Sequence, residues 1–244
     1  MERRPQPRLR RVQLLNLARA LCAAPLLVVA QPATAQTVED SQLWWQLNAV
    51  APLSKTVRLT LEQIGRLSDD EGGLYQTEVG TLLGYKANSH VELGFGYRRV
   101  GGHNGQRDAD EDRIRQHVIL TFGRFTGRFR VDERFRDDRP GVGIRIRPLL
   151  RYNLPIGRTK GLAAFYSHES FFLPNTTVFQ RSGYERMRNI VGVTLPIAKG
   201  VSADMGYLNQ YRFARAGGRA QMVHALTVQM TLSMTPHPTP KLDD

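Results

Sequence analysis

Residues 128–136, RFRVDERFR, decide the fold class of this 244-residue chain. Phe129, Val131 and Phe135 alternate with charged residues, and this period of two is that of a β-strand, whose successive side chains point to opposite faces. One face is therefore apolar, with Glu133 as its exception, and the other consists of arginine and aspartate. Lipid outside and a wet or ion-paired lumen inside would suit these two faces, as in transmembrane β-barrels.

Ten further segments show the same alternation, and most of the eleven are eight to thirteen residues long. A tilted strand crosses a bilayer in about 9 to 11 residues, whereas strands of soluble proteins most often have about 5 or 6. We therefore predict an all-β, antiparallel up-and-down barrel of the outer-membrane type with about 10 to 12 strands. The predicted strands are residues 43–50, 57–66, 74–85, 90–99, 113–123, 128–137, 143–153, 162–172, 183–195, 201–213 and 220–232.

The count of eleven conflicts with the even strand number of bacterial single-chain barrels, which keep both ends in the periplasm. Two solutions are open. Residues 36–42 form an extra or bent first strand, or residues 43–50 do not span fully, which gives twelve or ten strands. The connections alternate between short turns, such as residues 124–127, and longer polar links, such as residues 100–112, a pattern typical of periplasmic turns and outer loops.

The two ends of the chain are predicted to lie outside the barrel. Arginines precede an apolar run at residues 20–30, and Ala33, Thr34 and Ala35 follow it, which is the order of a signal peptide cleaved after Ala35. Residues 1–35 are then removed, residues 36–234 form the barrel, and residues 235–244 form a flexible tail. We expect the outer membrane as the location, with membrane lipid and the outer-membrane insertion machinery as partners.

The charge pattern and the cysteine content argue against a nucleic-acid-binding protein and against a metal or cofactor site. The formal charge of +12 falls to +7 without residues 1–35, because 28 basic and 21 acidic residues remain. The arginines recur at alternate strand positions instead of clustering on a helix, so we expect no nucleic-acid partner. Cys22, the only cysteine, lies in the predicted signal, and we expect neither a metal site nor a cofactor.

Charged residues on the polar faces are the candidate site. Glutamates on three successive strands precede strands rich in arginine, which predicts an acidic wall beside a basic wall and ion pairs that fill a narrow lumen. Rings of arginine also line anion pores, so a lumen that takes small anionic solutes is the alternative. The lumen-facing candidates are Arg58, Glu62, Glu78, Glu92, Arg113, Arg115, Arg128, Arg130, Arg134, Arg136, Arg145, Arg147 and Arg151.

The sequence offers no convincing catalytic constellation, and we expect no enzyme. His168, Glu169 and Ser170 suggest a hydrolase, but on a strand Glu169 points away from the other two, so a relay needs another partner. An outer-membrane lipid hydrolase would require a His–Ser pair within hydrogen-bond reach and an acid on adjacent strands. The other alternative is a periplasmic, lipocalin-like ligand-binding barrel, whose interior would be apolar and whose arginines would lie outside.

Loops and aromatic residues complete the sequence-based picture. We interpret His103 and the acidic run at residues 108–112 as a solvated outer loop, since the spacing of a calcium loop is missing. Aromatic side chains near strand ends are typical of the girdles at membrane interfaces. They are Trp44, Trp45, Tyr75, Tyr85, Tyr97, Tyr152, Tyr184, Tyr207 and Tyr211.

The order of several short motifs resembles one protein family. LWWQL at residues 43–47, LS at 53–54 and LTLE at 59–62 resemble the opening of the DUF2490 family. The resemblance continues through residues 75–85, LGFGYR at 93–98 and the arginine-rich strands at 113–137, and it spans nearly the whole mature chain. It implies a small bacterial outer-membrane barrel of undetermined function and supplies no catalytic residues. For this chain we expect a structural or solute-related role.

Overall fold

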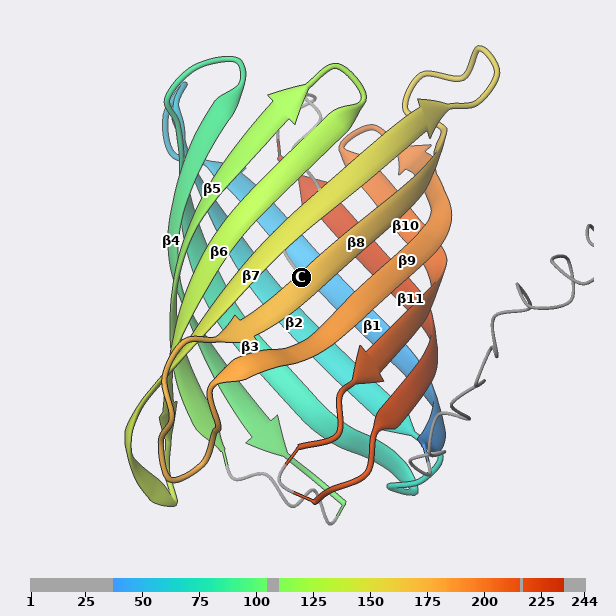
Figure 1. Ribbon diagram of the computed structural model, residues 1–244. Helices are drawn as coiled ribbons and strands as arrows, with labels where there is room; N and C mark the ends of the chain where they lie inside the picture. The colour runs from blue at the N-terminus through green and yellow to red at the C-terminus, as the bar shows by residue number, and fades with distance from the viewer. Residues whose placement is uncertain (1–36, 105–109, 216, 235–244) are drawn as a thin grey trace, which may run out of the picture. The chain divides into compact units, whose positions relative to one another are not determined.

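The computed structural model describes residues 37–104, 110–215 and 217–234, in which eleven strands form one closed barrel (Figure 1). The predicted signal peptide and the predicted tail lie outside these residues. No described segment is a helix with the length and apolar character needed to cross a membrane. The strands are β1 (Val38–Pro52), β2 (Val57–Ser68), β3 (Gly73–Lys86), β4 (Val91–Gly102), β5 (Glu111–Phe122), β6 (Phe125–Arg136), β7 (Arg139–Pro155), β8 (Ala163–Leu173), β9 (Gly183–Ala198), β10 (Val201–Arg212) and β11 (Gln221–Ser233).

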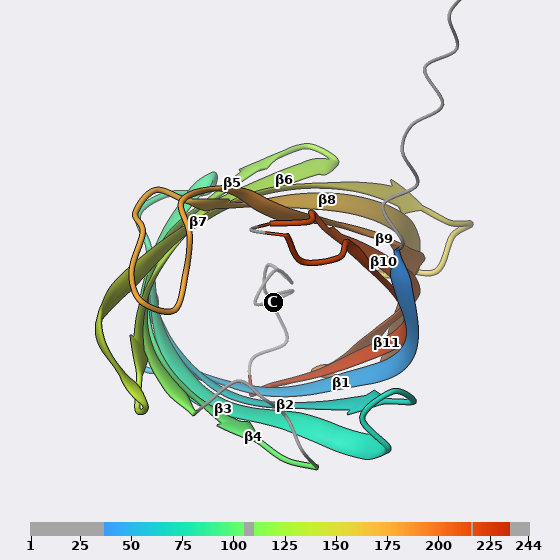
Figure 2. The same cartoon turned by 60° about the horizontal axis from the view of Figure 1, so that its bottom comes forward.

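Every strand pairs antiparallel with its sequence neighbours, and β1 closes the barrel by pairing parallel with β11. The pairing runs from Val38 beside Gln221 to Val50 beside Ser233. The predicted all-β barrel of about 10 to 12 strands is confirmed, whereas the two even-numbered solutions, twelve or ten strands, are both wrong. A parallel closing pair accommodates an odd number, and residues 38–42 extend the first strand instead of adding another. Figure 2 shows β1 between β2 and β11 in the ring of strands.

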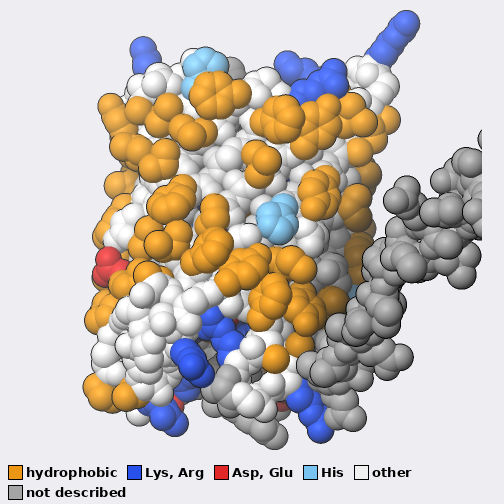
Figure 3. Space-filling model, viewed as in Figure 1, with side chains coloured by type: hydrophobic (Ala, Val, Ile, Leu, Met, Phe, Trp, Pro, Cys, Tyr) orange, Lys and Arg blue, Asp and Glu red, His pale blue; other side chains and the backbone are white. Residues whose placement is uncertain are grey.

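The two faces of the barrel wall differ as the alternation predicts. Phe95, Phe129 and Leu226 on the outer face are 57%, 52% and 54% exposed. Figure 3 shows apolar side chains spread over the wall, while the lysine and arginine side chains visible there gather at its two ends. On the inner face, by contrast, Arg130 and Asp132 are fully buried. This is the reverse of a lipocalin-like barrel, whose interior would be apolar.

Two aromatic residues do not lie where the sequence analysis placed them. Trp44 and Tyr75 are buried on the inner face, at 6% and 9% exposure, instead of contributing to an outer girdle. Trp44 shares its face of β1 with buried Gln46, because positions two apart on a strand point the same way. Trp45 lies on the outer face across from Gly65, where a Cβ would collide with the indole, so glycine is required at this position.

Candidate functional site in the barrel lumen

Arginines outnumber carboxylates in the ion-pair network of the lumen. Apart from the separate pairs Arg58–Glu92 and Arg151–Asp204, six carboxylates pair with twelve arginines among the described residues, so this network has six more arginines than carboxylates. The carboxylates are Glu62, Glu78, Glu111, Asp132, Glu169 and Glu185. The arginines are Arg66, Arg98, Arg113, Arg115, Arg128, Arg130, Arg134, Arg145, Arg147, Arg186, Arg188 and Arg212.

Arg98 on β4 joins the two glutamates of the acidic wall. Its Nη2 donates to Glu62 Oε2 at 2.9 Å, and its Nη1 donates to Glu78 Oε2 at 2.9 Å. Arg115 on β5 also donates to Glu62, and Arg113 approaches Glu78 at 3.5 Å. Strands β2 and β3 thus supply the carboxylates that neutralise the arginines of β4 and β5.

A second group of ion pairs lies on the opposite part of the wall. Glu169 on β8 accepts from Arg147 Nη2 at 2.9 Å and from Arg128 Nη2 at 2.7 Å. Asp132 on β6 accepts from Arg145 Nη2 at 2.8 Å. Each carboxylate therefore neutralises arginines from more than one strand, and this sharing fastens neighbouring strands to one another.

All thirteen lumen-facing candidates point inward, and each contacts an oppositely charged side chain. Arg136 differs from the others, because its partner is the turn residue Asp138. Sequence reasoning left several network residues out of the candidate set. Arg98 could have been predicted, because it lies on the same face of its strand as Glu92. Glu185 and Arg186 could not, because these consecutive residues pair within the lumen beside a register shift between β8 and β9, and no sequence pattern indicates that shift.

A cavity of about 240 Å³ lies at the end of the lumen where β1 begins. Nine arginines of the network line it: Arg66, Arg98, Arg113, Arg134, Arg145, Arg147, Arg186, Arg188 and Arg212. Asp40, Asp70 and Glu71 are its acidic lining residues. Trp44 contributes an aromatic surface, with the guanidinium carbons of Arg66 and Arg188 at 4.1 and 4.7 Å from its ring centroid. Such stacking orients a guanidinium while its N–H groups stay available for ligands.

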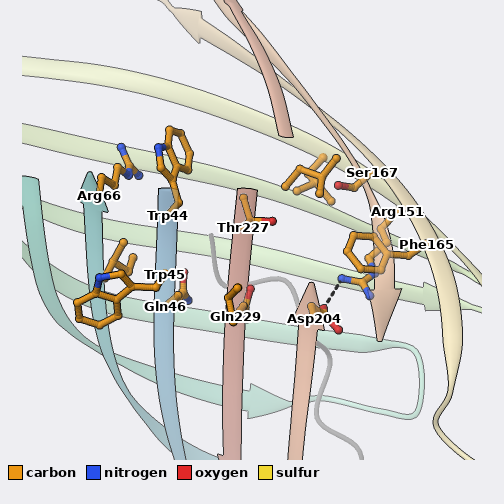
Figure 4. A pocket seen from close by; sticks show the side chains of 14 residues that line it. Trp44, Trp45, Gln46, Arg66, Arg151, Phe165, Ser167, Asp204, Thr227 and Gln229 are labelled. Carbon is orange, nitrogen blue, oxygen red and sulfur yellow. Dashed lines mark hydrogen bonds and ion pairs between the residues drawn. The ribbon is translucent and has the colours of Figure 1, made fainter. Parts of the chain in front are cut away.

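The middle of the lumen is filled by side chains. Arg115, Arg130 and Asp132 expose 2%, 1% and 0% of their surface, so water does not reach them. Trp44 and Arg66 line both the arginine-lined cavity of about 240 Å³ and a second cavity of about 50 Å³. Figure 4 shows these two side chains side by side. The ion pair from Arg151 Nη1 to Asp204 Oδ2, 2.8 Å, lies at this second cavity.

Arg99 on β4 pairs with acidic side chains of β5, of the segment before it and of the β6–β7 turn. Arg99 lies 3.2 Å from Asp110 and 3.3 Å from Asp112, and it also hydrogen bonds to Asp137 in the β6–β7 turn. These hydrogen bonds lower the pKa of Asp137 below its ordinary value. Asp108 lies outside the described residues, within which no group of three or more metal-ligating side chains occurs.

Comparison with known proteins places this barrel among its relatives. The family described as "Protein of unknown function (DUF2490)" matches residues 41–221. An uncharacterized protein of Methylorubrum extorquens is 30% identical over 223 residues, which cover 88% of this chain and 95% of the relative.

Solved structures show weaker likeness. One chain, from a structure described as "Unveiling the Mechanism Behind the in-meso Crystallization of Membrane Proteins", has a TM-score of 0.38 and 15% identity over 74% of this chain and 86% of its own length. The siderophore receptor PirA of Pseudomonas aeruginosa has a TM-score of 0.23 and 13% identity over 71% of this chain and 34% of its own. From the match over residues 41–221 and the relative in Methylorubrum extorquens, the chain belongs to the DUF2490 family.

Proposed function

We propose that the protein is an outer-membrane β-barrel that binds small anionic solutes in the arginine-lined cavity and forms no open pore. The observation that carries this proposal is the shortage of carboxylates: the twelve arginines of the network share six of them, and nine of these arginines line one cavity, to which Asp40, Asp70 and Glu71 add three acidic side chains. The predicted signal peptide would export the chain, and the insertion machinery would then place the barrel in the lipid of the outer membrane.

The outer wall supports the membrane location. The strands contain 11 to 17 residues, enough for a tilted strand to cross a bilayer, which needs about 9 to 11. Exposed apolar side chains occur on most of them, including Leu47, Leu61, Phe95, Tyr166 and Leu226. Soluble monomers rarely expose apolar patches beyond a few hundred Å². Contact with lipid removes the cost of exposing this wall to water.

Uncompensated charge supports anion binding. Burying a cation is costly unless a counter-charge lies nearby, and each carboxylate of the network already neutralises two or three arginines. An anion in the cavity would supply the missing charge, and the planar guanidinium suits the paired oxygens of phosphate or carboxylate groups. A volume of about 240 Å³ holds such a group together with a few waters.

The filled middle of the lumen favours binding over conduction. Ion transfer along the barrel axis would have to separate Arg115 from Glu62 and Arg147 from Glu169, which are buried ion pairs. Removing one partner of such a pair costs about 3–5 kcal/mol. The network thus also serves as a plug that braces the wall from inside, which is the structural part of the proposed role.

The test is thermal unfolding of the purified protein in detergent, with inorganic phosphate compared against chloride at equal ionic strength. A ligand at one hundred times its Kd stabilises the folded state by about 2.7 kcal/mol. We expect phosphate to raise the unfolding temperature of the wild type and of Arg158→Gln, a control that removes an exposed charge in the β7–β8 turn. Arg66→Gln/Arg212→Gln should lose this response.

The single variant Arg212→Gln is needed because the double variant Arg66→Gln/Arg212→Gln could lose the response by failing to fold. Arg212 has a side chain 40% exposed, so Arg212→Gln should fold and lose part of the response. Equal phosphate responses in the wild type, Arg158→Gln and Arg212→Gln, or no response in the wild type, would contradict anion binding in this cavity.

A further inference from the structure

Polar side chains of β8 and β9 form a connected group on the outer face of the wall. Tyr166, His168 and Ser170 alternate with the buried residues of β8, and Asn189 of β9 is the cross-strand partner of His168. His168 Nε2 lies 3.0 Å from Ser170 Oγ, and His168 Nδ1 lies 2.8 Å from Asn189 Oδ1. Ser170 Oγ also lies 3.1 Å from the hydroxyl of Tyr184.

The hydrogen bonds fix the roles of the two imidazole nitrogens. Tyr166 donates its hydroxyl proton to Asn189 Oδ1 at 2.9 Å, which marks this atom as the acceptor end of the amide. His168 Nδ1 then donates to the same oxygen, so in the neutral ring Nε2 carries the lone pair that faces Ser170. This is the arrangement of a nucleophilic serine, a general base and an orienting group.

The surroundings indicate which molecules could reach Ser170. Leu150, opposite His168 on β7, is 55% exposed, and Phe172 next along the outer face of β8 is 42% exposed. Tyr184 packs between Phe172 and Phe213, with ring centroids 4.8 and 4.9 Å away. An apolar acyl chain therefore fits the wall around Ser170, whereas a water-soluble ester would have no contacts to hold it.

Ser170 lies near the end of β8, where a membrane-spanning strand would meet the lipid headgroups. Ser170 precedes the end of β8 at Leu173 by three residues, or about 10 Å at the rise of a strand. Tyr184 is the second residue of β9. Aromatic side chains of transmembrane barrels concentrate at the boundary between the hydrocarbon core and the headgroups.

We propose that Ser170, His168 and Asn189 form an acyl-ester hydrolase site on the outer wall, with long-chain acyl esters of membrane lipids as the substrate class. The substrate class rests on the proposed membrane location, whereas the geometry of the three residues does not. Asn189 takes the place of the acid that the sequence analysis required, and Glu169 points into the lumen, where it pairs with arginines.

The reaction consists of two acyl transfers. As Ser170 Oγ bonds to the ester carbon, its proton passes to His168 Nε2, and the hydroxyl of Tyr184 donates to the oxyanion. The bond to the alcohol breaks, and His168 returns the proton to the leaving oxygen. Water then attacks the acyl-serine, gives a proton to His168, and releases the carboxylic acid while Ser170 regains its proton.

The test uses the full chain, purified in its folded form. Fluorophosphonate labelling located by mass spectrometry, and fatty-acid release from phosphatidylethanolamine–phosphatidylglycerol vesicles, report on the nucleophile and on turnover. A long-chain p-nitrophenyl ester in micelles separates a lipid requirement from a general acyl-ester requirement. We expect the label on Ser170, no turnover in Ser170→Ala, and about a 100-fold or greater loss in His168→Ala, the range for a general base.

Asn189 is a positioning residue, so its test must separate orientation from folding. Asn189→Ala should lower kcat with little change in KM, and Asn189→Asp, which keeps an acceptor oxygen, should recover part of the loss. His224→Ala is the matched control, because His224 also lies on the outer wall and hydrogen bonds to Tyr207.

The outcomes separate this inference from the proposed function. A protein that embeds in membranes but leaves Ser170 unlabelled, or keeps full turnover in Ser170→Ala, overturns the hydrolase site and leaves the barrel proposal intact. Labelling of Ser170 with micellar turnover in a protein that does not embed supports the site and overturns only the membrane location.

Discussion

Val38, the first residue of β1, lies beside Gln221, the first residue of β11, in a parallel register. The first and last strands therefore start at the same end of the barrel. Because the strand number is odd, the chain enters at one end and leaves at the other. Barrels with an even number of strands have both ends on one side.

This closure predicts a topology that surface labelling can test. Thr37→Cys and Met234→Cys flank the first and last strands, and both positions are exposed. In a background with Cys22→Ala, a membrane-impermeant maleimide added to intact cells should label one of the two variants and not the other. Labelling of both, or protection of both until the cells are lysed, would contradict the parallel closure.

Removing a shared carboxylate should destabilise the barrel. Glu169→Gln removes the charge that neutralises Arg128, Arg147 and Arg188 together. The expected loss in the free energy of unfolding is about 3–5 kcal/mol, the cost of leaving a buried charge unpaired. Urea unfolding in detergent measures it. Glu133→Gln on the outer face is the control and should be neutral or stabilising, so equal losses in both variants would argue against the network.

The contact between Gly94 and His117 gives a packing prediction. A Cβ at Gly94 would overlap the imidazole of His117, its buried cross-strand partner. Gly94→Ala should lower the free energy of unfolding by about 1–3 kcal/mol, the usual cost of overpacking. Gly127→Ala, whose nearest heavy atom would be 3.8 Å away, should be tolerated. In Gly94→Ala/His117→Ala the overlap is absent, and additive losses would exclude this explanation.

An arginine on the outer wall tests contact with lipid. Leu61 lies mid-way along β2 and is 51% exposed, and Leu53 lies in the β1–β2 turn and is 60% exposed. Leu61→Arg should cost about 2–4 kcal/mol in lipid vesicles, and Leu53→Arg about 0–1 kcal/mol, as for charges at the midplane and at the interface. Unfolding in vesicles by urea gives both values. A small effect at Leu61 would mean that water, and not lipid, covers this wall.

The sequence predicts the strands and the sidedness of the wall because both depend on local alternation. The predicted strands 128–137 and 201–213 differ from the observed β6 and β10 by at most three residues at either end, and the thirteen lumen candidates point inward. The parallel closure cannot be predicted from the sequence, because the pairing of β1 with β11 joins segments far apart in the chain and leaves no local pattern.

Register explains what else was missed. The place of Trp44 near the start of an expected strand predicts an outer girdle, but its side chain lies on the same face as Gln46 and points into the lumen. Asn189 could not be connected to His168 without the β8–β9 pairing, because a shift of one residue would turn it to the other face. The alternation of side chains can be read from one strand, whereas the identity of the residue opposite depends on how two strands pair.

Recovery of the protein from cell fractions, followed by gel electrophoresis with and without boiling, tests the central claim most directly. The account predicts recovery in the outer membrane and a band that migrates differently before boiling, because the lipid-embedded barrel resists unfolding by detergent until it is heated. Recovery as a soluble periplasmic protein with no boiling-dependent change would contradict it.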